Sequence, residues 1–361
     1  VKCLENEGIS VVYGYPGVAI CPFFNSILDS DIESVLVRTE QNGGHMASGY
    51  ARVTGKAGVC VSTSGPGATN LITGIATAYM DSIPMVAITG QVNTAQLGKD
   101  VFQEADITGA VESFVKYSYI VKNVEDIPRV FKEAFYIANT GRRGPVLIDV
   151  PIDVQNAKFD FSYPESVSLR TYKPTVKGHI IQIKKVIAEL SKAKMPLICV
   201  GGGTILGNGE QVVREFANKF HIPVVSTMMG IGVMPNDDDL YMGMLGTNGK
   251  PHANYAVHEC DVLVLVGARV ADRAVVKPYK LERRNTTIVH IDVDPAEIGK
   301  NLGTTVPLVG DVHVIFENLL QYEIPGDYTA WNEELAEKKA AYVDRRHFNP
   351  DFVNPCRFVQ T

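Results

Sequence analysis

The stretch VRTEQNGGHMASGYARVTGKAG at residues 37–58 decides the fold, because it joins a strand to a helix and places a carboxylate at the junction. The residues just before it, 32–37, are mostly apolar and β-branched, as in a buried strand. After Glu40, four residues recur at helical spacing, namely His45, Met46, Gly49 and Tyr50. We therefore predict that Glu40 lies at the carboxyl end of a strand and at the start of a helix.

Two interpretations of Glu40 follow from that position. In open α/β sheets, ligands bind in the crevice beyond the carboxyl ends of the strands, so a carboxylate there can face a bound cofactor. Alternatively, an acidic residue in the first turn of a helix is stabilised by the helix dipole and needs no ligand. The stretch itself is consistent with both interpretations.

The next segment repeats the pattern of strand, turn and helix. GVCVST at residues 58–63 predicts a short buried strand, and the apolar residues 71–80 predict a helix. The turn SGPGATN at residues 64–70 lies between them. Because Gly65 and Gly67 carry no Cβ, the backbone amides of this turn can approach a ligand closely. The turn is therefore a second candidate for a ligand-binding site.

Strands and helices alternate along the chain in two series. Residues 1–156 contain the first series and residues 179–325 the second. Residues 157–178 show no such alternation of strands and helices and are interpreted as a linker. Short, continuous apolar strands separated by helices predict a parallel sheet. We therefore expect an α/β protein with two doubly wound parallel-sheet domains in tandem. In residues 326–361, charged residues around Trp331 predict a solvated connecting helix that leads into a further domain.

The composition of the 361 residues limits the partners and the compartment. A formal net charge of −6 without a cluster of basic residues argues against a nucleic-acid or anionic-membrane partner. The six cysteines form no CxxC pair, so reduced thiols and a cytoplasmic location are expected. The sequence contains no apolar run of membrane-spanning length and no HExxH metal motif.

Six motifs in the first domain occur together in one family of enzymes. They are YGYPG (13–17), RTEQN (38–42), SGPGATN (64–70), PMVAITGQV (84–92), DVFQEAD (100–106) and GRRGPVLIDVPIDVQ (141–155). RTEQN, SGPGATN and PMVAITGQV together resemble the pyrimidine-binding domain of thiamine-diphosphate enzymes. With the other three motifs, the chain most resembles the acetohydroxyacid synthase family, also called acetolactate synthases. The resemblance covers nearly the whole chain, and the combination is far more specific than any single motif.

The resemblance implies a thiamine diphosphate site in the first domain. It assigns to Glu40 the catalytic role of hydrogen bonding to the pyrimidine ring nitrogen and relaying a proton, which is general acid/base catalysis. The residues that it assigns to cofactor binding here are Pro16, Gly17, Ser64, Gly65, Pro66, Gly67 and Asn70. Those that it assigns to the 2-ketoacid substrate are Phe102, Gln103, Asp272 and Arg273. For Phe102, packing in the hydrophobic core is the alternative.

A glycine-rich turn in the second domain is a candidate nucleotide site. VGGGTILGNG at residues 200–209 follows a predicted strand, but its spacing is not GxGxxG, so a purely structural turn is equally consistent. In the family, the matching turn contacts FAD. The resemblance assigns FAD binding to Arg170, Gly201, Gly202, Thr227, Gly246, Gly267, Arg269, Asp292 and Asp311. Asp292 at a strand's end suits hydrogen bonds to a ribose, whereas Asp294 before a proline suits a cap on the next turn.

Three segments depart from the family pattern. This chain has Val18 in place of the second glycine of PGG, LGTNG at residues 245–249 in place of LGMHG, and VADR at residues 270–273 in place of FDDR. These changes concern the flavin ring more than the adenosine end of FAD. A fourth difference is Thr39, which stands where the family usually has a histidine before the catalytic glutamate.

The resemblance implies the first two of the three domains of a catalytic subunit, so we expect a fragment that is inactive alone. No Asp is followed by Gly in this sequence, so the Mg²⁺ site that this pair begins is expected in the missing third domain. The implied activity is decarboxylation of pyruvate and ligation of the two-carbon unit to pyruvate or 2-ketobutyrate in branched-chain amino acid biosynthesis. The implied partners are a second copy or three further copies of the chain and a regulatory small subunit. Another thiamine-diphosphate decarboxylase or carboligase, or a noncatalytic flavin-nucleotide-binding module, remains an alternative.

Overall fold

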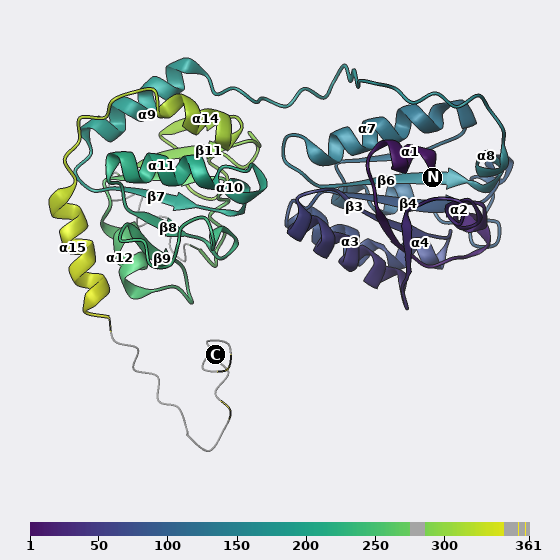
Figure 1. Ribbon diagram of the computed structural model, residues 1–361, viewed down its shortest axis with the longest axis horizontal. Coiled ribbons are helices and arrows are strands. Elements are labelled where there is room, and N and C mark those ends of the chain that lie inside the picture. Colours follow the sequence, from purple (N-terminus) through teal and green to yellow (C-terminus); the bar gives the residue numbers. More distant parts are fainter. Residues whose placement is uncertain (275–285, 343–352, 354–357, 359–361) are drawn as a thin grey trace. The chain divides into compact units, whose positions relative to one another are not determined.

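The computed structural model describes residues 1–274, 286–342, 353 and 358, which form two compact units, Val1–Pro174 and Thr175–Thr361. Each unit is built on a six-stranded sheet in which the neighbouring strands pair in parallel (Figure 1). Helices connect the strands and lie on the faces of the sheets. The predicted α/β class with two parallel sheets is confirmed.

The sheet of unit 1 has the strand order β2-β1-β3-β4-β6-β5. Its strands are β1 (Val11–Gly14), β2 (Glu33–Leu36), β3 (Gly58–Ser62), β4 (Met85–Gln91), β5 (Tyr117–Ile120) and β6 (Pro145–Pro151). Between β1 and β3 the chain changes the direction in which it adds strands. In parallel sheets, ligands bind at such a switch point, beyond the carboxyl ends of the strands. The topology therefore places the candidate site at the ends of β1 and β3.

Helices cover both faces of this sheet. α7 (Ile127–Asn139) contacts β4 and β6, while α3 (Glu40–Thr54) contacts β1 and β3 and lies on the other side of the sheet in Figure 1. The remaining α-helices of the unit are α1 (Lys2–Asn6), α2 (Cys21–Ile27), α4 (Pro66–Asn70), α5 (Ile72–Met80), α6 (Ile107–Ala110) and α8 (Ile152–Asn156). β3, β4 and β6 are buried at every residue, which explains their continuous apolar sequences.

α3 begins at Glu40, as the sequence predicts, and its buried face consists of small residues. The buried residues are Gly43, Gly44, Ala47, Ser48 and Ala51, whereas His45, Met46 and Gly49 are exposed. A Cβ at Gly74 of α5 would lie 2.9 Å from the Cα of Gly44. A Cβ at Gly58 of β3 would lie 2.0 Å from the carbonyl oxygen of Ala47. Because these contacts involve bare backbone, α3 lies close to both β3 and α5.

The sheet of unit 2 has the order β12-β11-β10-β7-β8-β9. Its strands are β7 (Pro196–Val200), β8 (Val224–Ser226), β9 (Tyr241–Met244), β10 (Val262–Val266), β11 (Thr287–Asp292) and β12 (Val306–Val309). Its described helices are α9 (Ile180–Lys192), α10 (Gly202–Leu206), α11 (Glu210–Phe220), α12 (Pro251–Glu259), α14 (Val312–Leu319) and α15 (Thr329–Ala340). Strands and helices therefore alternate in this unit, as the sequence of residues 179–325 predicts.

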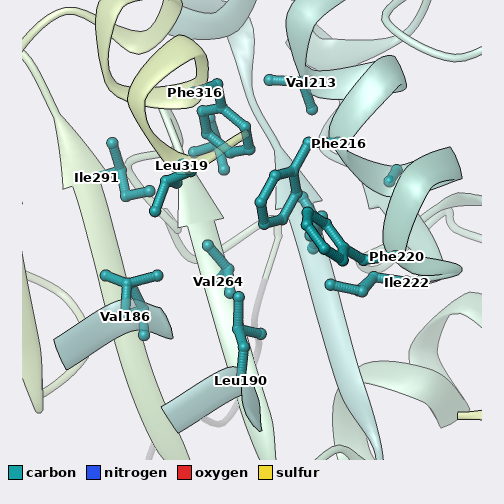
Figure 2. Close-up of a cluster of buried hydrophobic side chains, with 14 of the residues drawn as sticks. Val186, Leu190, Val213, Phe216, Phe220, Ile222, Val264, Ile291, Phe316 and Leu319 are labelled. Atoms are coloured by element: carbon teal, nitrogen blue, oxygen red, sulfur yellow. The ribbon is translucent and has the colours of Figure 1, made fainter. Parts of the chain in front are cut away.

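Two hydrophobic clusters lie on opposite faces of the unit 2 sheet, because side chains alternate along each strand. In β7, Ile198 belongs to one cluster and Leu197 to the other. Figure 2 shows part of the first cluster, in which the ring of Phe216 lies between α11 and α14. The centroid of this ring is 4.9 Å from that of Phe220 and 5.2 Å from that of Phe316.

α15 is anchored to unit 2, which corrects the prediction of a solvated helix. Trp331 and Leu335 are 2% and 0% exposed and belong to the second cluster. The Trp331 Nε1–H donates to the carbonyl oxygen of Pro196 over 3.1 Å. The charged residues of α15 therefore cover only its outer face. None of the helices in the described ranges combines the length and hydrophobicity that a membrane crossing requires.

The end of unit 1 packs back on its own core. Tyr163 Oη donates to Glu7 Oε1 over 2.8 Å, and the ammonium group of Lys132 lies 2.8 Å from the same carboxylate oxygen. Tyr172 Oη accepts a hydrogen bond of 2.8 Å from Lys116 Nζ. The stretch that the sequence predicts as a linker, residues 157–178, thus belongs to unit 1 up to Pro174.

Candidate active site

Three loops of unit 1 meet beyond the carboxyl ends of its central strands. Gly17 follows β1, Glu40 opens α3 after β2, and the turn at residues 64–67 follows β3. A Cβ at Gly17 would lie 2.5 Å from the Cβ of Thr63, and one at Gly67 would lie 3.2 Å from Glu40 Oε1. The residues in these loops that the sequence assigns to thiamine diphosphate are Pro16, Gly17, Glu40, Ser64, Gly65, Pro66, Gly67 and, at the end of α4, Asn70. The structure brings the three loops into contact.

Glu40 is the first residue of α3 and is held by a side chain from α4. Thr39 caps the helix, since its Oγ1 accepts a hydrogen bond of 3.4 Å from the backbone N–H of Asn42. Asn70 Nδ2 donates to Glu40 Oε2 over 3.0 Å. Glu40 Oε1 accepts no hydrogen bond from a described residue and lies beside Gly67. The carboxylate thus benefits from the helix dipole and also presents one oxygen to a ligand.

The turn after β3 depends on glycine at two positions. Gly65 has a φ of +59°, in the left-handed region that side chains with a Cβ rarely adopt. A Cβ at Gly67 would lie 2.7 Å from Thr63 Cγ2 and 2.9 Å from Ser62 Oγ. Any larger residue would therefore push the turn away from Glu40.

A buried hydroxyl in this turn fits a polar ligand. Thr63 Oγ1 is buried and has no hydrogen-bond partner among the described residues. A buried hydroxyl without a partner is costly, so such a group commonly marks a place where another polar atom binds. Together with the single free oxygen of Glu40, Thr63 shows that the site has polar atoms available for a heteroaromatic ring such as the aminopyrimidine.

The loop between η2 (Thr94–Gln96) and α6 carries two of the predicted substrate residues. Phe102 is 87% exposed, so the alternative that it packs in the core is wrong. Gln103 has a φ of +59°, and its backbone lies against the turn after β3. A Cβ at Gly65 would approach the Gln103 carbonyl oxygen to 2.8 Å. The structure thus places Gln103 at the turn.

A buried polar network lies at the ends of β4 and β6 and was not predicted from the sequence. Asp149 is 1% exposed and accepts hydrogen bonds from Thr89 Oγ1 over 2.7 Å and Gln91 Nε2 over 2.9 Å. Gln91 Nε2 also donates to the carbonyl oxygen of Ala105 over 2.9 Å. Burial, with a smaller contribution from the negative charge of Asp106, raises the pKa of Asp149 to about 7. In the sequence, an aspartate within LIDVP is indistinguishable from part of a buried strand.

In unit 2, the glycine-rich turn after β7 packs backbone to backbone against the end of β10. A Cβ at Gly201 would lie 2.3 Å from the carbonyl oxygen of Gly267, and one at Gly203 would lie 2.8 Å from its Cα. A Cβ at Gly202 would lie 3.0 Å from the Cβ of Met229. Gly267 itself has a φ of +54°. Close packing between two turns therefore accounts for these glycines, whether or not a nucleotide binds.

The acidic residues of unit 2 have protein partners. Asp292 ends β11, and its Oδ1 accepts from the N–H of Asp294 over 2.9 Å. Asp294 Oδ1 accepts from the N–H of Ala296 over 3.0 Å, as expected for a cap on the next turn. Asp311 caps α14, since its Oδ1 accepts from the N–H of Val314 over 3.1 Å.

The segments LGTNG and VADR contact each other. The N–H of Thr247 donates to the carbonyl oxygen of Arg273 over 3.1 Å. A Cβ at Gly246, which has a φ of +102°, would lie 2.3 Å from the same oxygen. Val270 is buried with a φ of +49°, which is unusual for a β-branched residue. Asp272 and the side chain of Arg273 are exposed.

The remaining predicted residues divide between the two units. Thr227 follows β8, and its N–H donates to the carbonyl oxygen of Val200 over 2.9 Å. The carbonyl oxygen of Arg269 accepts from Asn301 Nδ2 over 2.7 Å. Arg170 is exposed and belongs to unit 1 rather than unit 2. Likewise, of the residues predicted to bind the substrate, Phe102 and Gln103 lie in unit 1 and Asp272 and Arg273 in unit 2.

Protein-family models match both units. The model for the thiamine pyrophosphate enzyme N-terminal TPP binding domain matches residues 1–110, and that for the central domain of the same enzymes matches residues 183–319. The chain is a member of the thiamine pyrophosphate enzyme family. The N-terminal match includes Glu40 and the turn after β3, which agrees with the predicted thiamine diphosphate site.

Several curated relatives of this thiamine pyrophosphate enzyme are acetolactate synthase subunits. The chain is 44% identical over its whole length to the probable acetolactate synthase large subunit of Methanocaldococcus jannaschii. It is 45% identical over its whole length to acetolactate synthase isozyme 3 large subunit of Escherichia coli, and 45% identical over 94% of its length to the acetolactate synthase large subunit of Haemophilus influenzae. The alignments cover 62%, 64% and 61% of these relatives, so the chain spans about three fifths of their length.

The described part of the chain contains free thiols but no group of side chains suited to a metal ion. Within the ranges that the structure describes, no three His, Cys, Asp or Glu side chains are arranged to hold a metal ion. Cys3, Cys60, Cys199 and Cys260 are buried thiols, and Cys21 is an exposed one. Burial raises the pKa of Cys60 and of Cys199 to about 12, so these thiols stay protonated near neutral pH.

Proposed function

We propose that this chain is part of the catalytic subunit of an acetolactate synthase. Such an enzyme decarboxylates pyruvate and joins the two-carbon unit to pyruvate or 2-ketobutyrate in branched-chain amino acid biosynthesis. The observation that carries the proposal is the Glu40–Asn70 pair at the turn after β3. Support for the specific reaction comes from relatives named acetolactate synthase large subunit that are 44% to 46% identical to the chain.

The residues of unit 1 have distinct roles in this proposal. When bound, thiamine diphosphate supplies the carbon centre that attacks a 2-ketoacid and stabilises the charge left by decarboxylation. Glu40 Oε1 would accept or donate a hydrogen bond at the pyrimidine ring and so hold or move a proton there, which is general acid/base catalysis. Asn70 keeps Oε2 occupied, so that only one oxygen of the carboxylate faces the ring. Phe102 and Gln103 contact the 2-ketoacid in this proposal.

FAD and Mg²⁺ complete the proposed set of cofactors. In this proposal the turn at Gly201 and Gly202 after β7 and the carboxylate of Asp292 at the end of β11 bind the adenosine end of FAD. Mg²⁺ holds the diphosphate of the cofactor in the region of the relatives that this chain does not span. We therefore expect residues 1–361 alone to form no acetolactate.

The proposed assembly is a homodimer or homotetramer in the cytoplasm. Glu40 can act only if a diphosphate-binding surface is brought to it, and we propose that a second subunit supplies this surface. The relatives are named large subunits, which supports a small regulatory subunit as a further partner.

The decisive experiment replaces Glu40 in the complete protein. The Glu40→Gln variant keeps the shape and the acceptor for Asn70 but removes the acid/base group. We expect exchange of the cofactor C2 proton, followed by NMR, to slow by about 10²-fold or more, and acetolactate formation from pyruvate to fall in parallel. The free energy of unfolding should change little, since the two side chains are nearly isosteric.

Glu33→Gln is the matched control, because Glu33 is an exposed glutamate on β2 in the same unit. Its exchange rate and activity should equal those of the wild-type protein. Unchanged C2 exchange in Glu40→Gln would remove Glu40 from the mechanism. A wild-type protein that exchanges C2 but forms another product from pyruvate would point to a different carboligase of the same family.

A further inference from the structure

The loop that carries Phe102 and Gln103 is closed by one carboxylate. Glu104 accepts hydrogen bonds from the backbone N–H groups of Gly98, of Lys99 over 3.3 Å and of Val101 over 3.1 Å. These hydrogen bonds lower the pKa of Glu104, the one from Gly98 most of all. A carboxylate is suited to this task because both of its oxygens accept hydrogen bonds and neither donates one.

The loop holds a conformation that its residues do not favour on their own. Asp100 has a φ of +53° and Gln103 a φ of +59°, so two residues with a Cβ lie in the left-handed region within four positions. Such conformations persist only where the surrounding structure enforces them, and they cluster at functional sites. The three N–H donors to Glu104 flank Asp100, and the last of them, Val101, lies two residues before Gln103.

One end of the loop is fixed to α8 and the other to β4. At its beginning, the N–H of Thr94 donates to Asp153 Oδ1 of α8 over 3.0 Å. At its end, the carbonyl oxygen of Ala105 accepts from Gln91 Nε2 over 2.9 Å. Between these anchors, the segment from Gly98 to Glu104 has no strand or helix of its own. Glu104 therefore determines where the tip of the loop lies.

The result is a specific placement of Gln103 at the proposed cofactor site. Its backbone lies against Gly65, where an added Cβ would be 3.0 Å from the Gln103 Cα. The neighbouring Phe102 points outward and is 87% exposed. Loss of the Glu104 hydrogen bonds would let the tip relax away from the turn.

We propose that Glu104 is a positioning residue for 2-ketoacid binding. By holding three backbone amides, it keeps Gln103 against the turn after β3 and presents Phe102 beside it. This inference rests on the proposed function, because it assumes that these two residues meet the ketoacid. In this proposal Glu104 acts through the loop backbone and not by contact with the cofactor or the substrate.

The first test follows the amides themselves in the complete protein. Hydrogen–deuterium exchange of the peptide covering residues 97–105 is compared in the wild-type protein and in Glu104→Gln, Glu104→Asp and Glu112→Gln. In Glu104→Gln one oxygen becomes an NH₂ group that faces backbone donors, so exchange should accelerate about tenfold or more. Glu104→Asp keeps the carboxylate and should retain part of the protection. Glu112, an exposed glutamate on η3 (Glu112–Phe114), is the control and should give wild-type exchange.

The second test separates positioning from proton transfer. In Glu104→Gln we expect the KM for pyruvate to rise about tenfold, as for a displaced binding group, and Glu104→Asp to recover part of that loss. Exchange of the cofactor C2 proton should stay within about twofold of wild type, because Glu40 and Asn70 are untouched.

The outcomes separate this inference from the proposed function. Unchanged amide exchange in Glu104→Gln, or faster exchange with an unchanged KM, would overturn the positioning role. A loss of C2 exchange in Glu104→Gln would also overturn it, because the residue would then act on proton transfer. If the wild-type protein forms no acetolactate, the proposed function fails. Amide exchange of the 97–105 peptide does not depend on that activity, so unaltered exchange in Glu104→Gln would still refute the positioning by Glu104.

Discussion

Asp149 shows how a single buried residue links stability to pH. Its carboxyl group is 1% exposed, and only neutral donors, Thr89 and Gln91, hydrogen bond to it. Burial and the nearby charge of Asp106 raise the pKa of Asp149 from 3.8 to about 7, although its two hydrogen bonds oppose this change. The folded protein therefore keeps a proton on Asp149 over a range of pH in which the unfolded chain has lost it.

We predict that the free energy of unfolding of unit 1 falls as the pH rises from about 4 to about 7. In this window the native state binds more protons than the unfolded state, so stability is present at low pH and is lost with increasing pH. Each unit of pKa difference corresponds to about 1.4 kcal/mol, which gives at most ~4 kcal/mol for Asp149. Asp149→Asn cannot ionise and should remove this part of the pH dependence.

Urea unfolding at pH 5 and pH 8 tests the Asp149 prediction. The difference in unfolding free energy between the two pH values should shrink in Asp149→Asn and persist in Asp160→Asn, which changes an exposed aspartate of the same unit. Equal pH differences in the wild-type protein and in Asp149→Asn would contradict it.

At the scale of elements, α3 and α5 approach each other through bare backbone. The contact between Gly44 and Gly74 brings the start of α5, and with it Asn70 at the end of α4, close to α3 and Glu40. Gly49 lies on the same helix α3 but faces open space, with no atom within 4 Å of an added Cβ. Replacing Gly74 and Gly49 by alanine should thus have opposite effects on the stability of unit 1.

We predict that Gly74→Ala destabilises unit 1 by about 1–3 kcal/mol, the usual cost of overpacking, because its Cβ would lie 2.9 Å from the Cα of Gly44. Gly49→Ala should stabilise the unit by up to ~1 kcal/mol through the higher helix propensity of alanine. Thermal unfolding of both variants measures the difference. If Gly74→Ala were as stable as Gly49→Ala, the close contact between the helices would be wrong.

The elements also show what the sequence can and cannot predict. β3, β4, β6, β7 and β10 were predicted because they are buried on both faces and read as apolar runs. The strands that the prediction omits are β5, β9 and β12, and all three lie at the edges of their sheets. An edge strand is partly exposed, so polar residues such as Ser118 interrupt its pattern.

The sequence predicts the main residues of the candidate site but not the contacts between them. Glu40 and the glycine turn follow directly from a strand-to-helix pattern, and their contact is present in the structure. The hydrogen bond from Asn70 to Glu40 and the network around Asp149 depend on tertiary contacts between distant segments. Glu104 lies in the motif DVFQEAD. Its hydrogen bonds to backbone N–H groups form only in the folded loop, so the sequence alone does not predict them.

At the scale of the whole molecule, the boundary of unit 1 follows from side chains after β6. Tyr163 is hydrogen bonded to Glu7 of the first turn beyond α1, and Tyr172 to Lys116 before β5. Phe159 and Leu169 pack on the same core as these tyrosines. The segment after residue 156 is thus part of the folded unit up to Pro174.

We predict that a fragment of residues 1–174 is more stable than one of residues 1–156. The shorter fragment exposes the surface that the four side chains cover, at a cost of at least about 3 kcal/mol, the range of a large apolar truncation. Chemical unfolding of both fragments provides the measurement. Equal unfolding midpoints would show that the segment only connects the two units.

The strand order of unit 2 also determines how this unit can form during synthesis. β7 is the first strand of the unit to leave the ribosome, yet it lies at the centre of the sheet between β8 and β10. β8 can pair with it early, but the other side of β7 stays open until β10 has emerged, after α10, α11 and α12. A nascent unit 2 therefore exposes an apolar strand edge while the residues between β7 and β10 are synthesised, and this half of the protein is where we expect a chaperone to bind the growing chain.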